Sequence, residues 1–301
     1  MRAAALLLLL LPCLALGAKV QTYEDTLGTT LTLHLQNAPF PDGRARYHDD
    51  TVVVFVPREY RIQKRTAFLV HFHGHGNTAR SGLEGLRIRE QLVLARQNAI
   101  LVAPQAALMA SDSDPGKFAR DGTFKRMMAE VMAELHRQGF APRRGSIGAI
   151  VLSSHSGGFA ITSAVLQHGG LPVSGVLLFD SLYGQIDEFA RWIAADRRHR
   201  FASVVNTGGR PAKGNRALAR LLREAHVPFA AEETEGTLSR LQLGRSRVLL
   251  LETPLGHAEC AYAHLTLRDL LLVSVLPRFL ASSWFKVKGR SPRHLEAYHY
   301  P

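Results

Sequence analysis

Short apolar runs alternate with longer amphipathic stretches along most of this 301-residue chain, and this alternation limits the possible folds more than any other feature. Most of the runs consist of Val, Leu, Ile and Ala and are apolar at nearly every position, as in strands that are covered on both faces. The stretches between them have the periodicity of helices. We therefore predict an α/β fold with a mostly parallel, eight-stranded sheet and helices on both faces.

The same pattern gives the expected order of elements. Strands are expected at 30–35, 51–56, 67–72, 99–103, 149–153, 175–179, 202–205 and 248–251, and helices at 83–96, 124–137, 157–167, 186–195, 215–225 and 258–279. The first two strands have no helix between them, so we expect them to form an antiparallel edge. The longest irregular stretches, 107–122 and 231–246, are too short for a separate domain, so we expect little or no cap over the sheet.

The first 18 residues differ from the rest. Arg2 supplies a positive start, residues 3–16 are almost unbroken Leu and Ala, and Gly17 and Ala18 end the run. This layout predicts a signal peptide, and the apolar run is short for a membrane span. We expect a secreted or periplasmic protein with one α/β domain at 19–283 and a basic tail at 284–301; an uncleaved anchor is the alternative.

The cysteines bear on both stability and chemistry. Cleavage near Ala18 removes Cys13 and leaves Cys260 alone, so we expect no internal disulfide. Cys260 comes three residues after His257, so one interpretation is a cysteine nucleophile with a histidine base. No tight turn precedes it, however, and it lies in an Ala/Leu-rich run, so we predict a small buried apolar residue.

The chain is strongly basic, with 37 Lys and Arg against 25 Asp and Glu and a net charge of +12. An exported protein of this charge could meet an anionic cell-envelope surface, and the tail at 284–301 is its most basic segment. The basic residues are scattered and follow no nucleic-acid-binding motif, so we expect no nucleic-acid partner. Coding bias toward arginine is the simpler explanation of the charge.

The most informative motif lies where a predicted strand meets a predicted helix. The strand runs into His155-Ser156-Gly157-Gly158, and a helical pattern follows. A sharp turn between a strand and a helix lifts a serine hydroxyl above the sheet edge and directs backbone N–H groups at developing negative charge. We predict Ser156 as a nucleophile and the Gly157 N–H as one oxyanion donor. A capping serine in an ordinary turn is the alternative.

A second oxyanion donor is expected in the loop after the third strand, which reads His73-Gly74-His75-Gly76. A glycine-bearing turn at the carboxyl end of a central strand lets backbone N–H groups approach a ligand. We expect the main chain of His75 to supply this donor, with Gly76 as the alternative. His73 and Gly74 are expected to support the loop.

A general base and an orienting acid should follow the serine. His257 comes after the last predicted strand and before the last predicted helix, where a base can reach the serine. Asp180 ends the strand at 175–179 on the same edge of the sheet and is the predicted acid. Glu252 is too close to His257 along its own strand. Asp180 could instead cap the turn into Ser181.

These motifs, in the order Ser, Asp, His, resemble those of the α/β-hydrolase superfamily of serine esterases and lipases, over roughly Thr51 to Phe279. The resemblance implies hydrolysis of a small-molecule or polymeric acyl substrate, carboxylesterase-like, through an acyl-enzyme intermediate and without a cofactor. The chain departs from the pattern in two places. Ser154 replaces a glycine before His155, and the segment 205–209 after the seventh strand has no carboxylate, whereas Asp180 matches the position that some members use.

Three other functions stay open. The same triad cleaves amide and peptide bonds. His71, His73 and His75 alternate and could bind zinc on one face of a strand, although no acidic ligand is near and the glycines indicate that the strand ends before His75. We therefore expect no metal. An inactive hydrolase-fold binding module is the third possibility.

Overall fold

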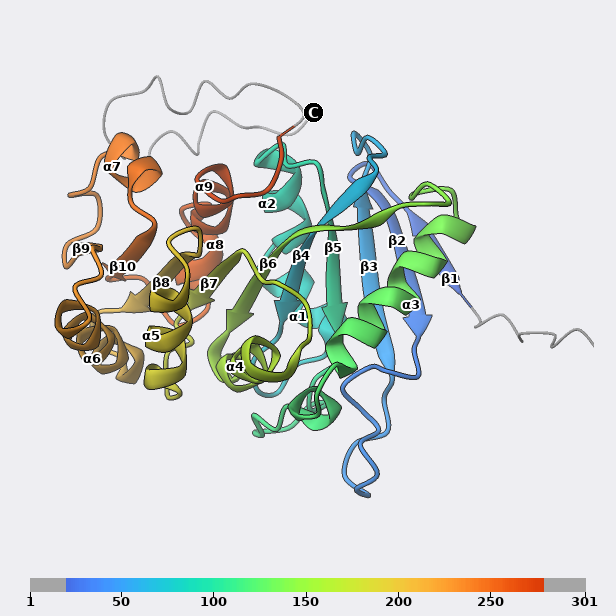
Figure 1. Ribbon diagram of the computed structural model, residues 1–301, viewed down its shortest axis with the longest axis horizontal. Helices are drawn as coiled ribbons and strands as arrows, with labels where there is room; N and C mark the ends of the chain where they lie inside the picture. Colours follow the sequence, from blue (N-terminus) through green and yellow to red (C-terminus); the bar gives the residue numbers. More distant parts are fainter. Residues whose placement is uncertain (1–19, 279–301) are drawn as a thin grey trace, which may run out of the picture.

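A ten-stranded sheet organises residues 20–278, which are the residues that this computed structural model describes (Figure 1). The strand order is β1-β2-β3-β5-β4-β6-β7-β8-β10-β9. The strands are β1 (Gln21–Glu24), β2 (Gly28–His34), β3 (Thr51–Pro57), β4 (Arg65–Phe72), β5 (Ala99–Pro104), β6 (Ser146–His155), β7 (Gly175–Phe179), β8 (Arg200–Asn206), β9 (Ala230–Glu232) and β10 (Val248–Thr253). The predicted signal peptide at 1–18 and the tail at 284–301 lie outside the described residues.

All eight predicted strands are present, and the predicted antiparallel edge is confirmed. β1, β2, β3 and β5 pair antiparallel, whereas every pair from β5 through β4, β6, β7, β8 and β10 to β9 is parallel. The prediction of eight strands missed β1 and β9. β1 is exposed along its whole length and β9 has three residues, so neither has the apolar run that marks a buried strand.

The helices are α1 (Ala79–Gly85), α2 (Ile88–Leu94), α3 (Thr123–Arg137), α4 (Phe159–His168), α5 (Ile186–Ala195), α6 (Arg210–Glu224), α7 (Arg240–Arg245), α8 (Glu259–Tyr262) and α9 (Thr266–Leu272). The prediction of one continuous helix at 83–96 and of another at 258–279 was wrong, because each region forms two short helices. The first breaks at Arg87 and the second at Leu265, and both residues adopt a left-handed conformation with φ of 51°. Neither is a glycine, so the sequence gives no sign of either break.

Helices cover both faces of the sheet, as predicted. One apolar core includes Phe68, Val70 and Leu152 on the sheet and packs under α3, α4, α5 and α6. The other includes Leu69 and Val151 and packs under α1, α2, α8 and α9. Neighbouring residues of a strand point to opposite faces, so apolar residues at every strand position bury both sides of the sheet.

The topology leaves the carboxyl ends of the parallel strands open. Between β7 and β8 the chain forms only α5, so no cap domain is inserted there. Within residues 20–278, no helix is long and apolar enough to cross a membrane. The turns after β4, β6, β7, β8 and β10 therefore meet along one edge of the sheet, where ligands bind in open α/β folds.

Candidate active site

The turn that carries Ser156 joins β6 to α4. β6 ends at His155, a short 3₁₀ turn (Ser156–Gly158) follows, and α4 begins at Phe159. Ser156 has φ of 52°, a left-handed conformation that costs a non-glycine residue of the order of 1–3 kcal/mol. The Ser181 hydroxyl donates a 2.7 Å hydrogen bond to the Ser156 carbonyl and helps to hold this backbone. The turn has the strained shape that presents a nucleophile above a sheet edge.

Glycines are required around this turn because other groups come very close. A Cβ on Gly74 would lie 2.7 Å from the Ser156 Cβ, and one on Gly158 would lie 2.7 Å from the Phe72 carbonyl oxygen. A Cβ on Gly157 would lie 2.3 Å from the ring of His75. The β4 loop and the β6 turn are therefore in direct contact, with the His75 ring against Gly157.

Ser154 fills the position where the hydrolase pattern has a glycine. Its side chain is fully buried, and its hydroxyl lies 3.0 Å from the hydroxyl of Ser181. A buried hydroxyl needs a hydrogen-bond partner, and Ser181 supplies it. The departure from the pattern is thus accommodated by a serine pair that links β6 to the turn after β7.

His257 and Asp180 form a hydrogen bond of 2.5 Å between Nδ1 and Oδ2. Asp180 is 3% exposed and its Oδ1 accepts a 3.0 Å hydrogen bond from the backbone N–H of Asn206. The Asn206 side chain in turn donates to the carbonyl of Leu255, just before His257. This pairing fixes a proton on Nδ1 and leaves Nε2 of His257 as an acceptor.

His155 places His257 beside the serine turn. Its Nε2 lies 3.0 Å from the His257 carbonyl oxygen, to which it donates, and the two ring centroids are 4.5 Å apart. Burial lowers the pKa of His155 to about 4, so its ring is neutral near pH 7. Among residues 20–278, no hydrogen bond joins the Ser156 hydroxyl to His257. Such bonds often tighten only when substrate binds.

Cys260 contributes no nucleophile. The side chain is fully buried, as predicted, and its thiol donates a weak 3.3 Å hydrogen bond to the carbonyl of His257. Burial raises the pKa of the Cys260 thiol well above its usual range, so the reactive thiolate is disfavoured.

The two candidates for the second oxyanion donor differ. The Gly76 N–H donates a 3.0 Å hydrogen bond to the carbonyl of Ala110, so this donor is already engaged. Within the described part of the chain, the His75 N–H donates to no other loop carbonyl. His75 lies against Gly157, whose own N–H belongs to the first turn after the serine. The main-chain N–H groups of His75 and Gly157 therefore stay the predicted oxyanion donors.

His73 holds the loop after β4 in place. Its Nδ1 donates a 2.8 Å hydrogen bond to the carbonyl of Gly74, and its Nε2 accepts from the backbone N–H of Ala106 at 3.1 Å. The Gln105 amide lies 2.8 Å from the same Nε2. Both ring nitrogens are therefore engaged in holding the loops after β4 and β5 together.

The alternating histidines do not converge on one point. His71 is buried under the sheet edge with its Nδ1 at 3.1 Å from the Ser153 hydroxyl, and burial lowers its pKa to about 3. The ring of His75 instead reaches the Ser113 hydroxyl at 2.7 Å. No group of three His, Cys, Asp or Glu side chains within residues 20–278 is arranged to hold a metal ion.

Three residues of this site were missed by sequence reasoning. Ser181 binds the serine turn, and Asn206 binds Asp180. The Tyr183 ring lies 6.4 Å from the His257 ring in an edge-on contact and 6.1 Å from the Phe159 ring. The only sign of Ser181 and Tyr183 in the sequence is their place directly after Asp180, at the carboxyl end of a strand.

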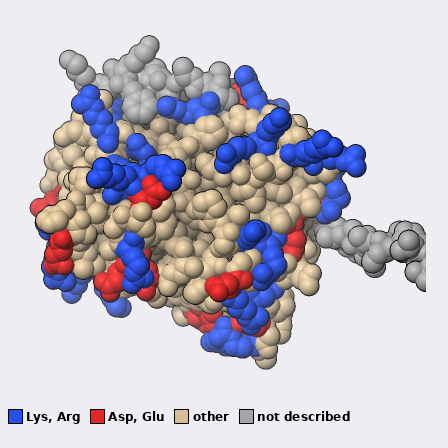
Figure 2. Space-filling view, in the orientation of Figure 1, with Lys and Arg blue, Asp and Glu red and all other residues tan. Residues whose placement is uncertain are grey.

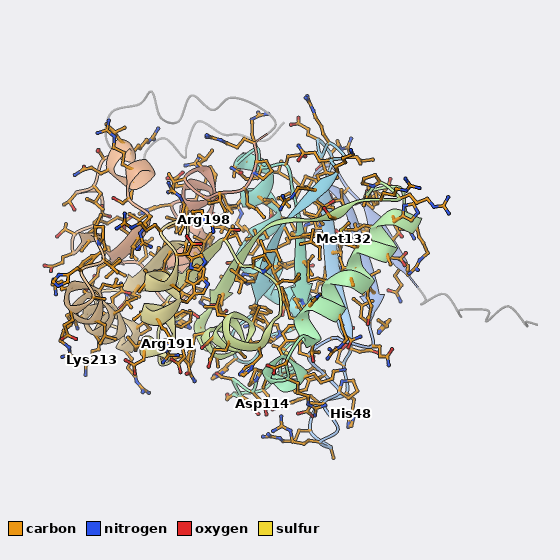
Figure 3. All side chains as sticks on the ribbon, viewed as in Figure 1. His48, Asp114, Met132, Arg191, Arg198 and Lys213 are labelled. Atoms are coloured by element: carbon orange, nitrogen blue, oxygen red, sulfur yellow. The ribbon has the colours of Figure 1, made fainter. Side chains whose placement is uncertain are left out.

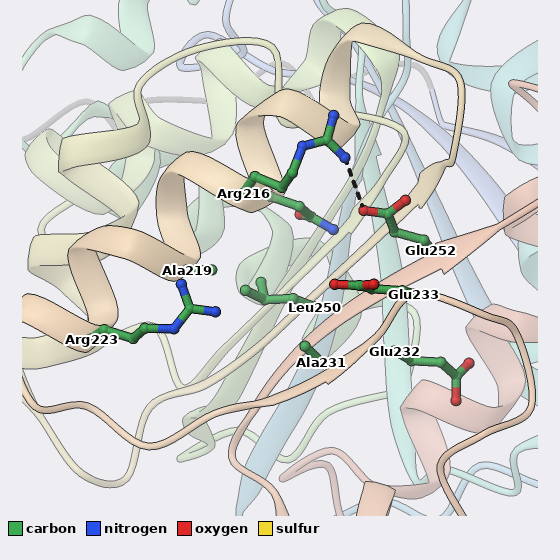
Figure 4. A pocket seen from close by; sticks show the side chains of 9 residues that line it. Arg216, Ala219, Arg223, Ala231, Glu232, Glu233, Leu250 and Glu252 are labelled. Carbon is green, nitrogen blue, oxygen red and sulfur yellow. Dashed lines mark hydrogen bonds and ion pairs between the residues drawn. The ribbon is translucent and has the colours of Figure 1, made fainter.

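A separate pocket of about 270 Å³ lies between α6 and the edge formed by β9 and β10 (Figure 4). Arg216 and Glu252 form a 3.3 Å ion pair across it. Glu252 is thus engaged away from His257, as its position along β10 predicts. None of Ser156, His257 or Asp180 lines this pocket.

Lys and Arg side chains are spread over the face shown in Figure 2, with uncharged surface between them.

Comparison with known proteins identifies the fold. No family model matches the chain, and no curated protein matches its sequence. Many solved structures are similar to the chain, and three of them are described here. A ferulic acid esterase has 14% identity and a TM-score of 0.51, over 81% of this chain and 96% of that one. The S-formylglutathione hydrolase FrmB of Staphylococcus aureus has 9% identity and a TM-score of 0.52, over 86% and 98%. The S. aureus fluorophosphonate-binding serine hydrolase FphF has 11% identity and a TM-score of 0.50, over 81% and 97%. The predicted α/β-hydrolase fold is confirmed.

Proposed function

We propose that this chain is a serine hydrolase that cleaves an ester, with Ser156 as nucleophile, His257 as general base and Asp180 as the orienting acid. The observation that carries the proposal is the 2.5 Å hydrogen bond from His257 to the buried Asp180, beside a serine in a left-handed turn. An ordinary capping serine needs neither feature. The fold similarity to structures named as esterases and serine hydrolases supports the same reaction class.

The geometry suggests the following sequence of steps. Nε2 of His257 takes the proton of the Ser156 hydroxyl as its oxygen attacks the ester carbonyl carbon, and Asp180 stabilises the resulting imidazolium. The N–H groups of Gly157 and His75 bind the oxyanion. The intermediate collapses, the alcohol leaves with the proton from Nε2, and Ser156 stays acylated. Water, deprotonated by His257, then attacks the acyl carbon, and His257 returns the proton to the Ser156 oxygen as the carboxylic acid leaves.

The open sheet edge favours accessible esters. Only α5 separates β7 from β8, so no inserted domain forms a deep lipid tunnel there. A soluble short acyl ester or an exposed ester of a polymer suits such a site. We further propose that residues 1–18 direct export, so that the enzyme acts outside the cytoplasm, where its +12 charge favours anionic surfaces.

A substrate panel tests the proposal. Purified protein is assayed on p-nitrophenyl esters of increasing chain length and on the matching p-nitroanilides, with and without EDTA. We expect hydrolysis of short esters that EDTA leaves unchanged and that Ser156→Ala lowers by at least about 10³-fold. Faster anilide cleavage would favour an amidase. If EDTA abolishes hydrolysis while the Ser156→Ala variant keeps it, a metal mechanism would be favoured. No turnover of any substrate would favour a binding module.

A further inference from the structure

A second cavity, of about 460 Å³, lies between α6 and the turn after β7, close to the proposed catalytic histidine through Tyr183. Tyr183 lies between the cavity and the proposed active site and contacts both. One side of its ring meets His257 edge-on at 6.4 Å between centroids, and the residue also lines the cavity. A molecule in this cavity therefore lies one aromatic ring away from the reacting groups.

The base of the cavity is held by close packing. Gly214 of α6 and Leu182 both line it, and a Cβ on Gly214 would lie 2.2 Å from the Leu182 carbonyl oxygen. Leu182 is fully buried. Because the backbones touch here, α6 cannot move away from the turn that carries Asp180 without breaking the core. The cavity thus has a fixed position relative to the proposed active site.

Two cationic side chains line this cavity. Arg210 and Lys213 occupy the first turn of α6, and both are exposed. Arg210 follows directly on the loop whose Asn206 N–H binds Asp180. Figure 3 places Lys213 on the outer side of α6. The same stretch of chain therefore positions both the orienting acid and the two cations.

These cations have no acidic partner, in contrast to some other cations on the same side of the molecule. Arg191 and Arg198, also labelled in Figure 3, pair with Glu188 at 3.2 Å and with Asp196 at 2.7 Å. Neither Arg210 nor Lys213 forms an ion pair with any residue in the range 20–278.

The position of the two cations is also unfavourable for the helix itself. The first turn of α6 has no acidic residue, and its N-cap, Gly209, has no side chain to accept its N–H groups. Positive charge at a helix N-terminus is disfavoured by the helix dipole. A bound anion would neutralise both effects.

We propose that the substrate of this hydrolase carries an anionic group, a carboxylate, phosphate or sulfate, which Arg210 and Lys213 bind while Tyr183 packs against the segment leading to the scissile ester. The inference rests on the proposed ester-hydrolase function and adds the substrate class. The anion can belong to the acyl part or to the alcohol part of the ester. The helix N-terminus and the two side chains favour any of the three anions in the same way.

Two matched substrate pairs distinguish the acyl part from the alcohol part. The first compares the mono-p-nitrophenyl ester of adipic acid with p-nitrophenyl hexanoate. The second compares the acetate ester of 4-hydroxy-3-nitrobenzoate with 2-nitrophenyl acetate. For each pair the ratio of kcat/KM, anionic over neutral, is measured in the unmodified protein, in Arg210→Gln/Lys213→Gln and in Arg220→Gln. Arg220 is exposed on the same helix but does not line the cavity.

We expect the double variant to lower this ratio about tenfold or more in one pair, because it removes two charge-assisted contacts. Arg220→Gln should leave both ratios unchanged, and added salt should lower the ratio in the unmodified protein. Equal ratios in the double variant and the unmodified protein, in both pairs, would overturn the inference while the ester-hydrolase function stands. No turnover of either neutral ester would overturn the function itself and the inference with it.

Discussion

Replacing Asp180 by asparagine tests the proposed triad most sharply, because the change keeps the shape of the side chain and removes its charge. Asp180 accepts two hydrogen bonds, from His257 Nδ1 at 2.5 Å and from the Asn206 N–H at 3.0 Å. An asparagine has one accepting oxygen and one donating NH₂ group. If its oxygen stays on the Asn206 N–H, its NH₂ faces Nδ1, and His257 must carry its proton on Nε2. A ring in that tautomer cannot take the proton of Ser156.

The size of the effect follows from this tautomer change. We expect kcat to fall about 10³- to 10⁴-fold, which corresponds to about 4–5.5 kcal/mol of transition-state stabilisation. The opposite orientation of the introduced amide would leave the Asn206 N–H unpaired, at a cost in stability of about 1–3 kcal/mol. Steady-state kinetics on p-nitrophenyl acetate and a urea unfolding curve measure the two quantities separately.

Glu252→Gln is the matched control. Glu252 is also a largely buried carboxylate at the carboxyl end of a strand, but it pairs with Arg216 at 3.3 Å and does not contact His257. We expect less than about a threefold change in kcat, because no group of the triad loses a partner. Near-normal kcat in Asp180→Asn together with a large loss in Glu252→Gln would refute this assignment of the acid.

Two further changes test the packing and the titration of the site. Gly74→Ala places a Cβ 2.7 Å from that of Ser156, so we expect kcat/KM to fall about 100-fold and stability by about 1–3 kcal/mol. A Cβ on Gly85 would have no atom within 4 Å, so Gly85→Ala should leave both kcat/KM and stability unchanged in the same kinetic and unfolding assays. His71 has a pKa of about 3 when folded, below its unfolded value, so the unfolded chain binds the extra proton and stability falls as pH drops from about 6.5. Between pH 6 and 4, His71→Asn should reduce the slope of the unfolding free energy against pH by up to about 1.4 kcal/mol per pH unit. Urea unfolding curves at several pH values measure this slope, and an unchanged slope would contradict the prediction.

The sheet could be predicted from the sequence because its signal is local. Strands that are buried on both faces leave apolar runs, and the ends of those runs gave the expected positions of Ser156, Asp180 and His257. The breaks at Arg87 and Leu265 could not be predicted, since both are non-glycine residues held in left-handed conformations by their surroundings.

The parts of the site that were missed depend on contacts between distant segments. The Gly76 N–H is engaged by Ala110, 34 positions further along the chain, and no pattern around Gly76 indicates this. Asn206 acts through its backbone N–H on Asp180, so its residue type carries no signal for that contact. Ser181 compensates for Ser154 only because β6 and β7 are neighbours. Such pairings require the three-dimensional fold.

Covalent labelling tests the central claim most directly, because a fluorophosphonate reacts only with an activated serine and stays bound to it. The purified protein is incubated with the probe, its intact mass is measured, and the modified residue is identified by peptide mapping. We predict one adduct per chain, on Ser156, that is absent in Ser156→Ala and strongly slowed in His257→Ala. An adduct on Ser154 or Ser181, or ester hydrolysis that survives in Ser156→Ala, would contradict the assignment of Ser156 as the nucleophile.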